Sequence, residues 1–188
     1  MSTPVESAPV PAAVAAAASP RIYLAGPDVF FPDREAIFQR LLAACDQLGL
    51  SGLPPWENSA GSAPLPTGTA LAQLIYQDNL RRIREADGVI ANLVNFRGLE
   101  PDSGTVFEMG FAIALGKPVV GYGVAPGDYA ERVAAQLACE RDAKGRLVES
   151  ASRRKVEDMG YPLNLMLACS APLEATAEDA LARIAKFF

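Results

Sequence analysis

Short apolar runs alternate with helix-like patterns along most of the chain, and this alternation restricts its fold more than any other feature. Three of the runs are bounded by Gly, Pro or charged residues, as buried strands are: RIYLAG (21–26), GVIANL (88–93) and PVVGYG (118–123). Residues 50–54 have the composition of a further, shorter strand. Strands separated by helices predict an α/β protein with a parallel sheet covered on both faces.

The segments between and after these runs carry apolar residues at helical spacing. The predicted helices cover residues 33–48, 70–86, 103–115 and 176–188. The charged region 125–160 predicts another helix, followed by a flexible insert around residues 143–146. We therefore expect one doubly wound sheet.

In a doubly wound sheet, ligands bind beyond the carboxyl ends of the strands. Three loops follow predicted strands and should line a common crevice there. They begin after Gly26, Leu93 and Gly123.

The first 19 residues differ in composition from the rest of the chain. They are rich in Ala and Pro and carry one charge, Glu6, so they lack the basic start of a secretory signal. We expect a disordered tail over 1–19 and one folded domain over 20–188, a length that supports a single sizeable core. No run reaches the roughly 18 apolar residues of a spanning helix, so no membrane association is expected.

Charge and residue usage exclude several classes of function. A net charge of −5 without a basic run argues against nucleic acid as a partner. Cys45, Cys139 and Cys169 match neither a disulfide framework nor a zinc site, which favours a reducing, cytoplasmic location. The chain has no His, which excludes Ser-His-Asp and Cys-His catalysis and His-ligated metals. Acid–base chemistry must therefore fall to carboxylates, tyrosines or lysines.

The segment 95–120 places two carboxylates, Asp102 and Glu108, around the start of a predicted helix. A helix N-terminus stabilises a carboxylate as the anion, which suits a nucleophile. A second carboxylate in the same pocket would have a raised pKa because of like-charge repulsion and desolvation, and it could protonate a leaving group. Glycosidases divide the work between two carboxylates in this way.

Each of these residues also has a purely structural interpretation. Thr105 and Glu108 form the T-x-x-E pattern of a helix capping box, which alone would explain the Glu. Asp102 could be a loop or cap residue, and Tyr23 a half-buried tyrosine of the first strand. Spacing alone does not decide between these interpretations.

Four blocks in order resemble the nucleoside 2-deoxyribosyltransferase family. They are IYLAGP (22–27), NLRRIREADGVIANL (79–93), FRGLEPDSGTVFEMGFAIALGKPV (96–119) and YPLNLM (161–166), and the resemblance covers about residues 21–170. It implies a flavodoxin-like doubly wound sheet and catalysis without metal or cofactor. It also implies a covalent deoxyribosyl-enzyme ester, with deoxyribonucleosides and free nucleobases as the partners.

The resemblance assigns three catalytic roles. Glu108 matches the nucleophile that attacks C1′ of the sugar, and Asp102 matches the acid that contacts the departing base. Tyr23 matches a tyrosine whose hydroxyl holds the nucleophile in position. Gly104, in the D-x-G-T signature, falls among the substrate contacts.

Further substrate contacts follow from the same resemblance. Asn79 stands where some members have an aspartate that helps to hold the base, and Phe30 either stacks on the base or packs under its loop. Asn164 and Met166 match residues that a neighbouring subunit lends to the site, which implies a homo-oligomer of unspecified size. Without the resemblance, Asn164 would be interpreted as a turn residue.

Two other functions fit the same fold. A deoxynucleoside 5′-monophosphate N-glycosidase would need phosphate donors in its first loop, whereas AGPDVFFPDR offers an acid, prolines and bulky apolar groups. A noncatalytic nucleotide-binding module would keep the crevice without any use for Glu108. The choice between purine and pyrimidine bases stays open.

Overall fold

The computed structural model describes residues 18–55 and 65–188, and its centre is a five-stranded parallel sheet. The strands are β1 (Arg21–Ala25), β2 (Ser51–Leu53), β3 (Gly88–Asn92), β4 (Val119–Tyr122) and β7 (Leu173–Glu174). Their order is β2-β1-β3-β4-β7, and every pairing is parallel. The predicted doubly wound, flavodoxin-like sheet is thus confirmed.

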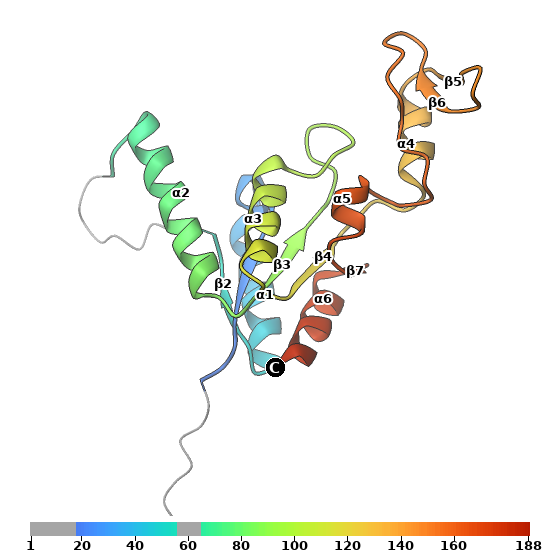
Figure 1. The fold of residues 1–188 in the computed structure, drawn as a ribbon. Coiled ribbons are helices and arrows are strands. Elements are labelled where there is room, and N and C mark those ends of the chain that lie inside the picture. The colour runs from blue at the N-terminus through green and yellow to red at the C-terminus, as the bar shows by residue number, and fades with distance from the viewer. Residues whose placement is uncertain (1–17, 56–64) are drawn as a thin grey trace, which may run out of the picture.

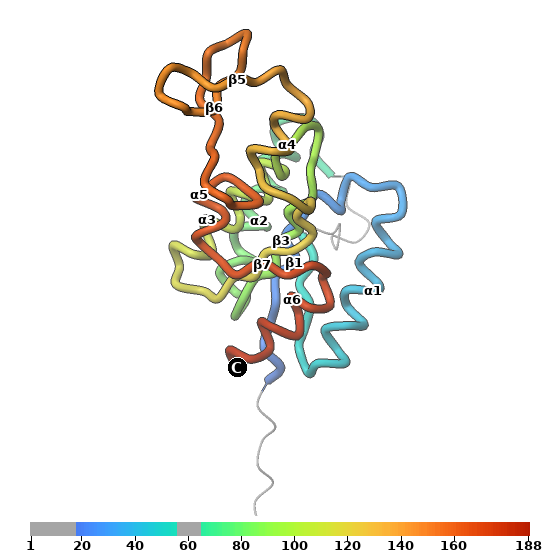
Figure 2. The backbone as a smooth tube through the Cα atoms, turned by 90° about the vertical axis from the view of Figure 1, so that its right-hand side faces the viewer, coloured from blue at the N-terminus to red at the C-terminus, as the bar shows by residue number. Residues whose placement is uncertain are grey.

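Helices cover both faces of this sheet (Figures 1 and 2). One face packs against α1 (Arg34–Gln47) and α6 (Ala177–Ile184). The other packs against α2 (Gly68–Glu85), α3 (Ser103–Ala114) and α5 (Leu165–Ala168). Because both faces are covered, the central strands are buried along almost their whole length, which explains their uninterrupted apolar sequences.

Alternation along β1 decides which side chains face which helices. Ile22 and Leu24 belong to the core beneath α1 and α6, whereas Tyr23 and Ala25 belong to the core beneath α2 and α3. Tyr23 is therefore the polar side chain that the first strand presents to α3.

An arm that stands apart from the sheet follows β4 (Figure 1). It consists of α4 (Tyr129–Gln136) and an antiparallel hairpin of β5 (Cys139–Arg141) and β6 (Leu147–Glu149). A small cluster of Ala130, Val133 and Val156 holds it together. The predicted helix is present, and residues 143–146 form the turn of this hairpin.

Several short elements complete the fold. They are the 3-10 helices η1 (Pro27–Phe30) and η2 (Ala185–Phe187). η2 lies inside the helix predicted over 176–188, whereas η1, α5 and β7 were not predicted. In the part of the chain that the structure describes, no helix is long and apolar enough to cross a membrane. Outside that part lie residues 56–64 and residues 1–17, which make up most of the predicted tail. The domain boundary at residue 20 therefore stays a prediction.

Candidate active site

Tyr23 and Glu108 meet between the sheet and α3. Tyr23 lies in the middle of β1 and is fully buried, and its hydroxyl donates a 2.7 Å hydrogen bond to Glu108 Oε1. Glu108 lies in the second turn of α3, on the side that faces the strand. The structure thus brings together two of the three residues to which the resemblance assigned catalytic roles.

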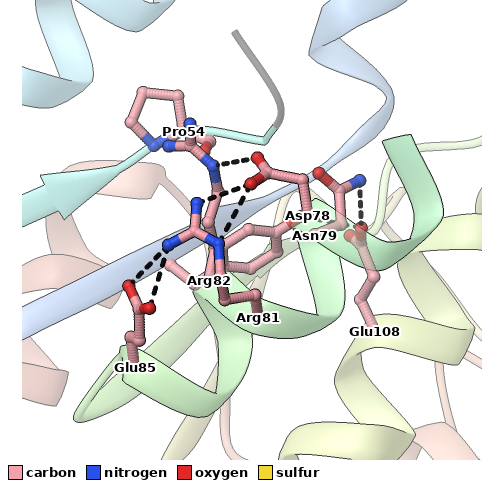
Figure 3. A network of polar contacts seen from close by, with 8 residues as sticks. Pro54, Asp78, Asn79, Arg81, Arg82, Glu85 and Glu108 are labelled. Carbon is pink, nitrogen blue, oxygen red and sulfur yellow. Dashed lines mark hydrogen bonds and ion pairs between the residues drawn. The ribbon is translucent and has the colours of Figure 1, made fainter. Parts of the chain in front are cut away.

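Asn79 of α2 adds a second hydrogen bond to the same carboxylate oxygen. Its Nδ2 lies 3.2 Å from Glu108 Oε1 (Figure 3). Tyr23 and Asn79 both donate to Oε1, and no residue among 18–55 and 65–188 donates a hydrogen bond to Oε2 of Glu108. Asn79, whose amide was expected to hold the base, therefore contacts the candidate nucleophile Glu108.

Ion pairs hold the part of α2 that carries Asn79. Arg82 Nε lies 2.7 Å from Asp78 Oδ2, both side chains are mostly buried, and Arg82 also donates to the carbonyl oxygen of Pro54. Arg81 bridges Asp78 and Glu85 along the helix surface (Figure 3). This network was not predicted, although the i,i+4 spacing of Asp78 and Arg82 is a signal for such a pair.

Burial dominates the protonation of Glu108 and raises its pKa to about 7. The hydrogen bond from Tyr23 lowers this pKa, the charge of Asp102 raises it, and the hydrogen bond from Asn79 lowers it. A helix N-terminus acts mainly within the first turn, so the expected stabilisation of the anion by α3 is not the main effect here. Burial and Glu108 raise the pKa of Tyr23 well above its usual range, which keeps its hydroxyl a donor.

Asp102 is the N-cap of α3. Its Oδ2 accepts hydrogen bonds from Thr105 N at 2.9 Å and from Thr105 Oγ1 at 3.1 Å. The capping-box interpretation of Glu108 is therefore wrong, because Asp102 and not Thr105 caps the helix. A Cβ at Gly104 would lie 3.0 Å from Asp102 Oδ2, so the glycine leaves room for this carboxylate.

Phe30 lies on the surface of the crevice loops. It is 59% exposed, and its ring stacks on Phe96 with the centroids 5.4 Å apart. The guanidinium group of Arg97 lies over both rings. Phe30 is thus not packed under its loop, and much of its surface stays open.

Asn164 and Met166 line a cavity between α5 and the first turn of α3. Asn164 is the N-cap of α5, accepts from Met166 N at 3.0 Å and donates to Glu157 at 2.9 Å. Met166 is 71% exposed. Both side chains border a cavity of about 330 Å³, together with residues of the acidic loop and of α3: Glu100, Pro101, Ser103 and Val106. Within its own chain, Asn164 acts as the turn residue that local spacing suggested.

A family model described as nucleoside 2-deoxyribosyltransferase matches residues 22–166, and this stretch includes every residue of the site described above. The chain belongs to the nucleoside 2-deoxyribosyltransferase family. Members of this family are enzymes that transfer glycosyl groups, and their small-molecule substrates are nucleosides and nucleobases.

A solved structure agrees with this membership in the nucleoside 2-deoxyribosyltransferase family, and a second one has the same fold. The chain is similar to a 2-desoxiribosyltransferase from Leishmania mexicana, with 32% identity, a TM-score of 0.68, and coverage of 89% of this chain and 97% of that one. It shares its fold with a conserved protein from Enterococcus faecalis V583, with 22% identity, a TM-score of 0.57, and coverage of 91% and 100%.

A curated relative has no described activity. It is the uncharacterized protein C191.05c of Schizosaccharomyces pombe, which is 31% identical over 115 residues, or 61% of this chain and 54% of that protein. The match thus spans about half the length of the relative.

Proposed function

We propose that this protein transfers the 2-deoxyribosyl group between purine or pyrimidine bases through a covalent ester on Glu108. The observation that carries the proposal is the buried Glu108 carboxylate, with Oε1 held by Tyr23 and Asn79 and with Asp102 close enough to raise its pKa. Family membership supplies the class of reaction.

In the first step, Glu108 Oε2 attacks C1′ while the bond from C1′ to the base nitrogen breaks. The electron pair of that bond goes to the base, which takes a proton from Asp102 or from a water that Asp102 positions. Oε2 suits the attack because Oε1 is already occupied by two donors. The β-nucleoside becomes an α-linked ester.

In the second step, a nitrogen of the incoming base attacks C1′ from the vacated face. The ester bond from C1′ to Oε2 breaks, its electron pair returns to Glu108, and the proton of the incoming base goes to Asp102. The product regains the β configuration, and ping-pong kinetics follow. Water in place of the base would give slow hydrolysis.

The remaining residues bind substrate in this proposal. The open face of Phe30 offers a surface on which a planar base stacks. Gly104 leaves space beside the Asp102 carboxylate. Asn164 and Met166 complete the site of a neighbouring subunit, so the working form is a homo-oligomer. Glu108 and Tyr23 crowd the 2′ position of the sugar, and turnover of adenosine as fast as deoxyadenosine would contradict this.

The first loop argues against a 5′-monophosphate substrate. Asp28 is buried and hydrogen-bonded to Asn92, and Phe30 is the exposed side chain of η1. Neither side chain is a donor for a phosphate. The transferase is therefore the better candidate.

Base exchange tests the proposal directly. Deoxyinosine mixed with adenine should yield deoxyadenosine and hypoxanthine by chromatography, and Glu108→Gln and Glu108→Ala should abolish the exchange. Glu35→Gln, which changes an exposed carboxylate of α1, is the matched control and should leave the rate unchanged. A 2′-fluorinated deoxynucleoside should leave a sugar adduct on Glu108. Hydrolysis without exchange, an adduct on Asp102, or full activity of the Glu108 variants would overturn the assignment.

A further inference from the structure

A buried carboxyl group that the proposed chemistry does not use lies at the carboxyl ends of the central strands. Asp28, the second residue of η1, is 4% exposed, and Asn92, the last residue of β3, is 6% exposed. Asn92 Nδ2 donates to both carboxylate oxygens of Asp28, at 2.9 Å and 3.1 Å. Asn92 follows Ile90 by two residues, so it lies on the α1 and α6 side of the sheet, opposite to Glu108.

Three loops meet at this pair. The loop after β3 begins with a hydrogen bond from Val94 N to Asn92 Oδ1, at 3.3 Å. The loops after β1 and β4 approach through glycines. A Cβ at Gly26 would lie 2.2 Å from Asp28 Oδ2, and a Cβ at Gly123 would lie 2.9 Å from Asn92 Oδ1. The pair thus forms the common base of the loops that line the crevice.

The tips of two of these loops also touch each other. Asp28 O accepts from Phe31 N at 3.1 Å, which closes the turn that exposes Phe30. Phe96, from the loop after β3, stacks on Phe30 with an angle of 26° between the rings. Arg97 lies over Phe96 at 4.7 Å and has a left-handed φ of 55°, which is uncommon for a residue other than glycine. The loops after β1 and β3 are thus in contact at their tips as well as at the Asp28–Asn92 pair.

Burial of the Asp28 carboxyl group costs desolvation free energy, so stability alone does not explain its presence. Desolvation raises the pKa of Asp28, while the hydrogen bond from Asn92 and the more distant charge of Arg40 lower it. Arg40 itself pairs with Glu178 at 3.6 Å. An apolar pair of the same volume would avoid the desolvation, but it would not fix the orientation of the two loops.

We propose that Asp28 and Asn92 are a positioning pair that holds Phe30 and Phe96 in the arrangement that receives the nucleobase. The inference rests on the proposed function and assigns the pair to base capture, not to the chemical step. Damage to the pair should therefore raise the KM for the donor nucleoside and leave kcat nearly unchanged.

A residue swap tests the pair. Asn92→Asp places two carboxylates together, and losing a charged hydrogen bond should raise the donor KM about tenfold or more, with kcat within about threefold. The double variant Asp28→Asn with Asn92→Asp restores an amide-to-carboxylate bond in the reverse direction. Its KM should return to within about threefold of the wild type. Glu35→Gln, which changes an exposed carboxylate of α1, is the matched control and should leave KM unchanged.

Hydrogen exchange provides a measurement that does not depend on activity. Amides of residues 26–31 and 93–98 should exchange faster in Asn92→Asp, while those of α6 should not, and the double variant should reverse the effect. Faster exchange in α6 as well would show general destabilisation and would overturn the proposal. Three kinetic results would also overturn the proposal: an unchanged KM in Asn92→Asp, a fall in its kcat without a rise in KM, or a KM of the double variant as high as that of Asn92→Asp. If the wild type does not exchange bases between nucleosides, the proposed function fails. Amide hydrogen exchange in the two loops still tests the role of the Asp28–Asn92 pair in that case.

Discussion

At Glu108, burial and hydrogen bonding act on one carboxyl group in opposite directions. Burial favours the protonated form, whereas Tyr23 and Asn79 donate to Oε1 and favour the anion. The result is a pKa of about 7, which leaves the group close to half ionised in a neutral solution. A nucleophile must be ionised, so small changes in these contacts should change the rate at neutral pH.

The pH profile should report this balance. We expect the rate of base exchange to rise with pH and to reach half its plateau near pH 7, the pKa of Glu108. Tyr23→Phe removes a contact that lowers this pKa, so its midpoint should move to higher pH. The rate at pH 6 should then fall by up to about tenfold for each pKa unit of change. Tyr76→Phe, an exposed tyrosine of α2, is the control, and an identical midpoint for Tyr23→Phe would contradict the assignment.

The same burial predicts that Glu108 lowers the stability of the fold in alkaline solution. A carboxyl group with a raised folded pKa stabilises the protein below its unfolded pKa of about 4.5, and this stability is lost as pH rises through about 7. Glu108→Gln should therefore raise the free energy of unfolding at pH 8, by about 3 kcal/mol at most, and change it little at pH 4. Urea unfolding at both values measures this, and a variant less stable at pH 8 would contradict it.

The contacts of Glu108 could be predicted from the sequence only in part. The resemblance identified Tyr23 and Glu108 as partners, and their 2.7 Å contact confirms that they are in reach. The position of Asn79 against Glu108 depends on how α2 packs on α3, which no local pattern describes. The Asp28–Asn92 pair left a weak signal in the sequence. Asp28 follows the run 21–26 by two residues, Asn92 is the last residue but one of the run 88–93, and the two runs form neighbouring parallel strands.

Among the elements, α3 begins with a residue, Asp102, that caps the helix and that the proposed mechanism also uses as the acid. Asp102 caps the helix through Thr105 and lies near Glu108. The cap also explains why a carboxylate stays at the entrance of the site. The two roles can be separated by substitution.

Two variants of Asp102 should have different effects. Asn caps helices as well as Asp, so Asp102→Asn should keep the free energy of unfolding within about 0.5 kcal/mol while base exchange falls strongly. Asp102→Ala should lose both the activity and about 0.5–2 kcal/mol of stability. Chemical unfolding and exchange rates measure the two effects. Equal activity of Asp102→Asn and the wild type would remove Asp102 from the proton transfer.

Elements with long or uninterrupted apolar patterns were the predictable ones. The strands β1, β3 and β4 and the helices α1, α2 and α3 lie where the sequence placed them, because each buries a continuous run or stripe. The strands β5, β6 and β7 are two or three residues long and partly exposed. Their burial depends on neighbours distant in sequence, so their composition resembles that of loops.

In the whole molecule, Asn164 and Met166 lie at the N-terminus of α5 and border a cavity that they share with the loop after β3 and the first turn of α3. In the proposed oligomer they serve the site of a neighbour. The exposed Met166 and its cavity lie on the surface that such a neighbour would cover.

Mixed oligomers test this sharing. Asn164→Ser keeps a helix-capping side chain but removes the amide. This variant and the separate variant Glu108→Ala should each be nearly inactive. Co-refolding them should restore about a quarter of the wild-type activity if the unit is a symmetric dimer, because half the dimers then contain one intact site. Glu108→Ala co-refolded with Glu108→Gln is the control. Absence of recovery would show that each chain builds its own site.

The hairpin of the arm leaves and re-enters the molecule at one point. Ser150 N donates to Ala138 O at 2.8 Å, so the chain segments on either side of residues 139–149 already meet. A segment whose ends are adjacent can be shortened, replaced or extended with little change in loop-closure entropy. The turn of this hairpin is therefore a suitable place to attach a fluorescent reporter or an affinity peptide to the protein without interrupting a strand of the central sheet.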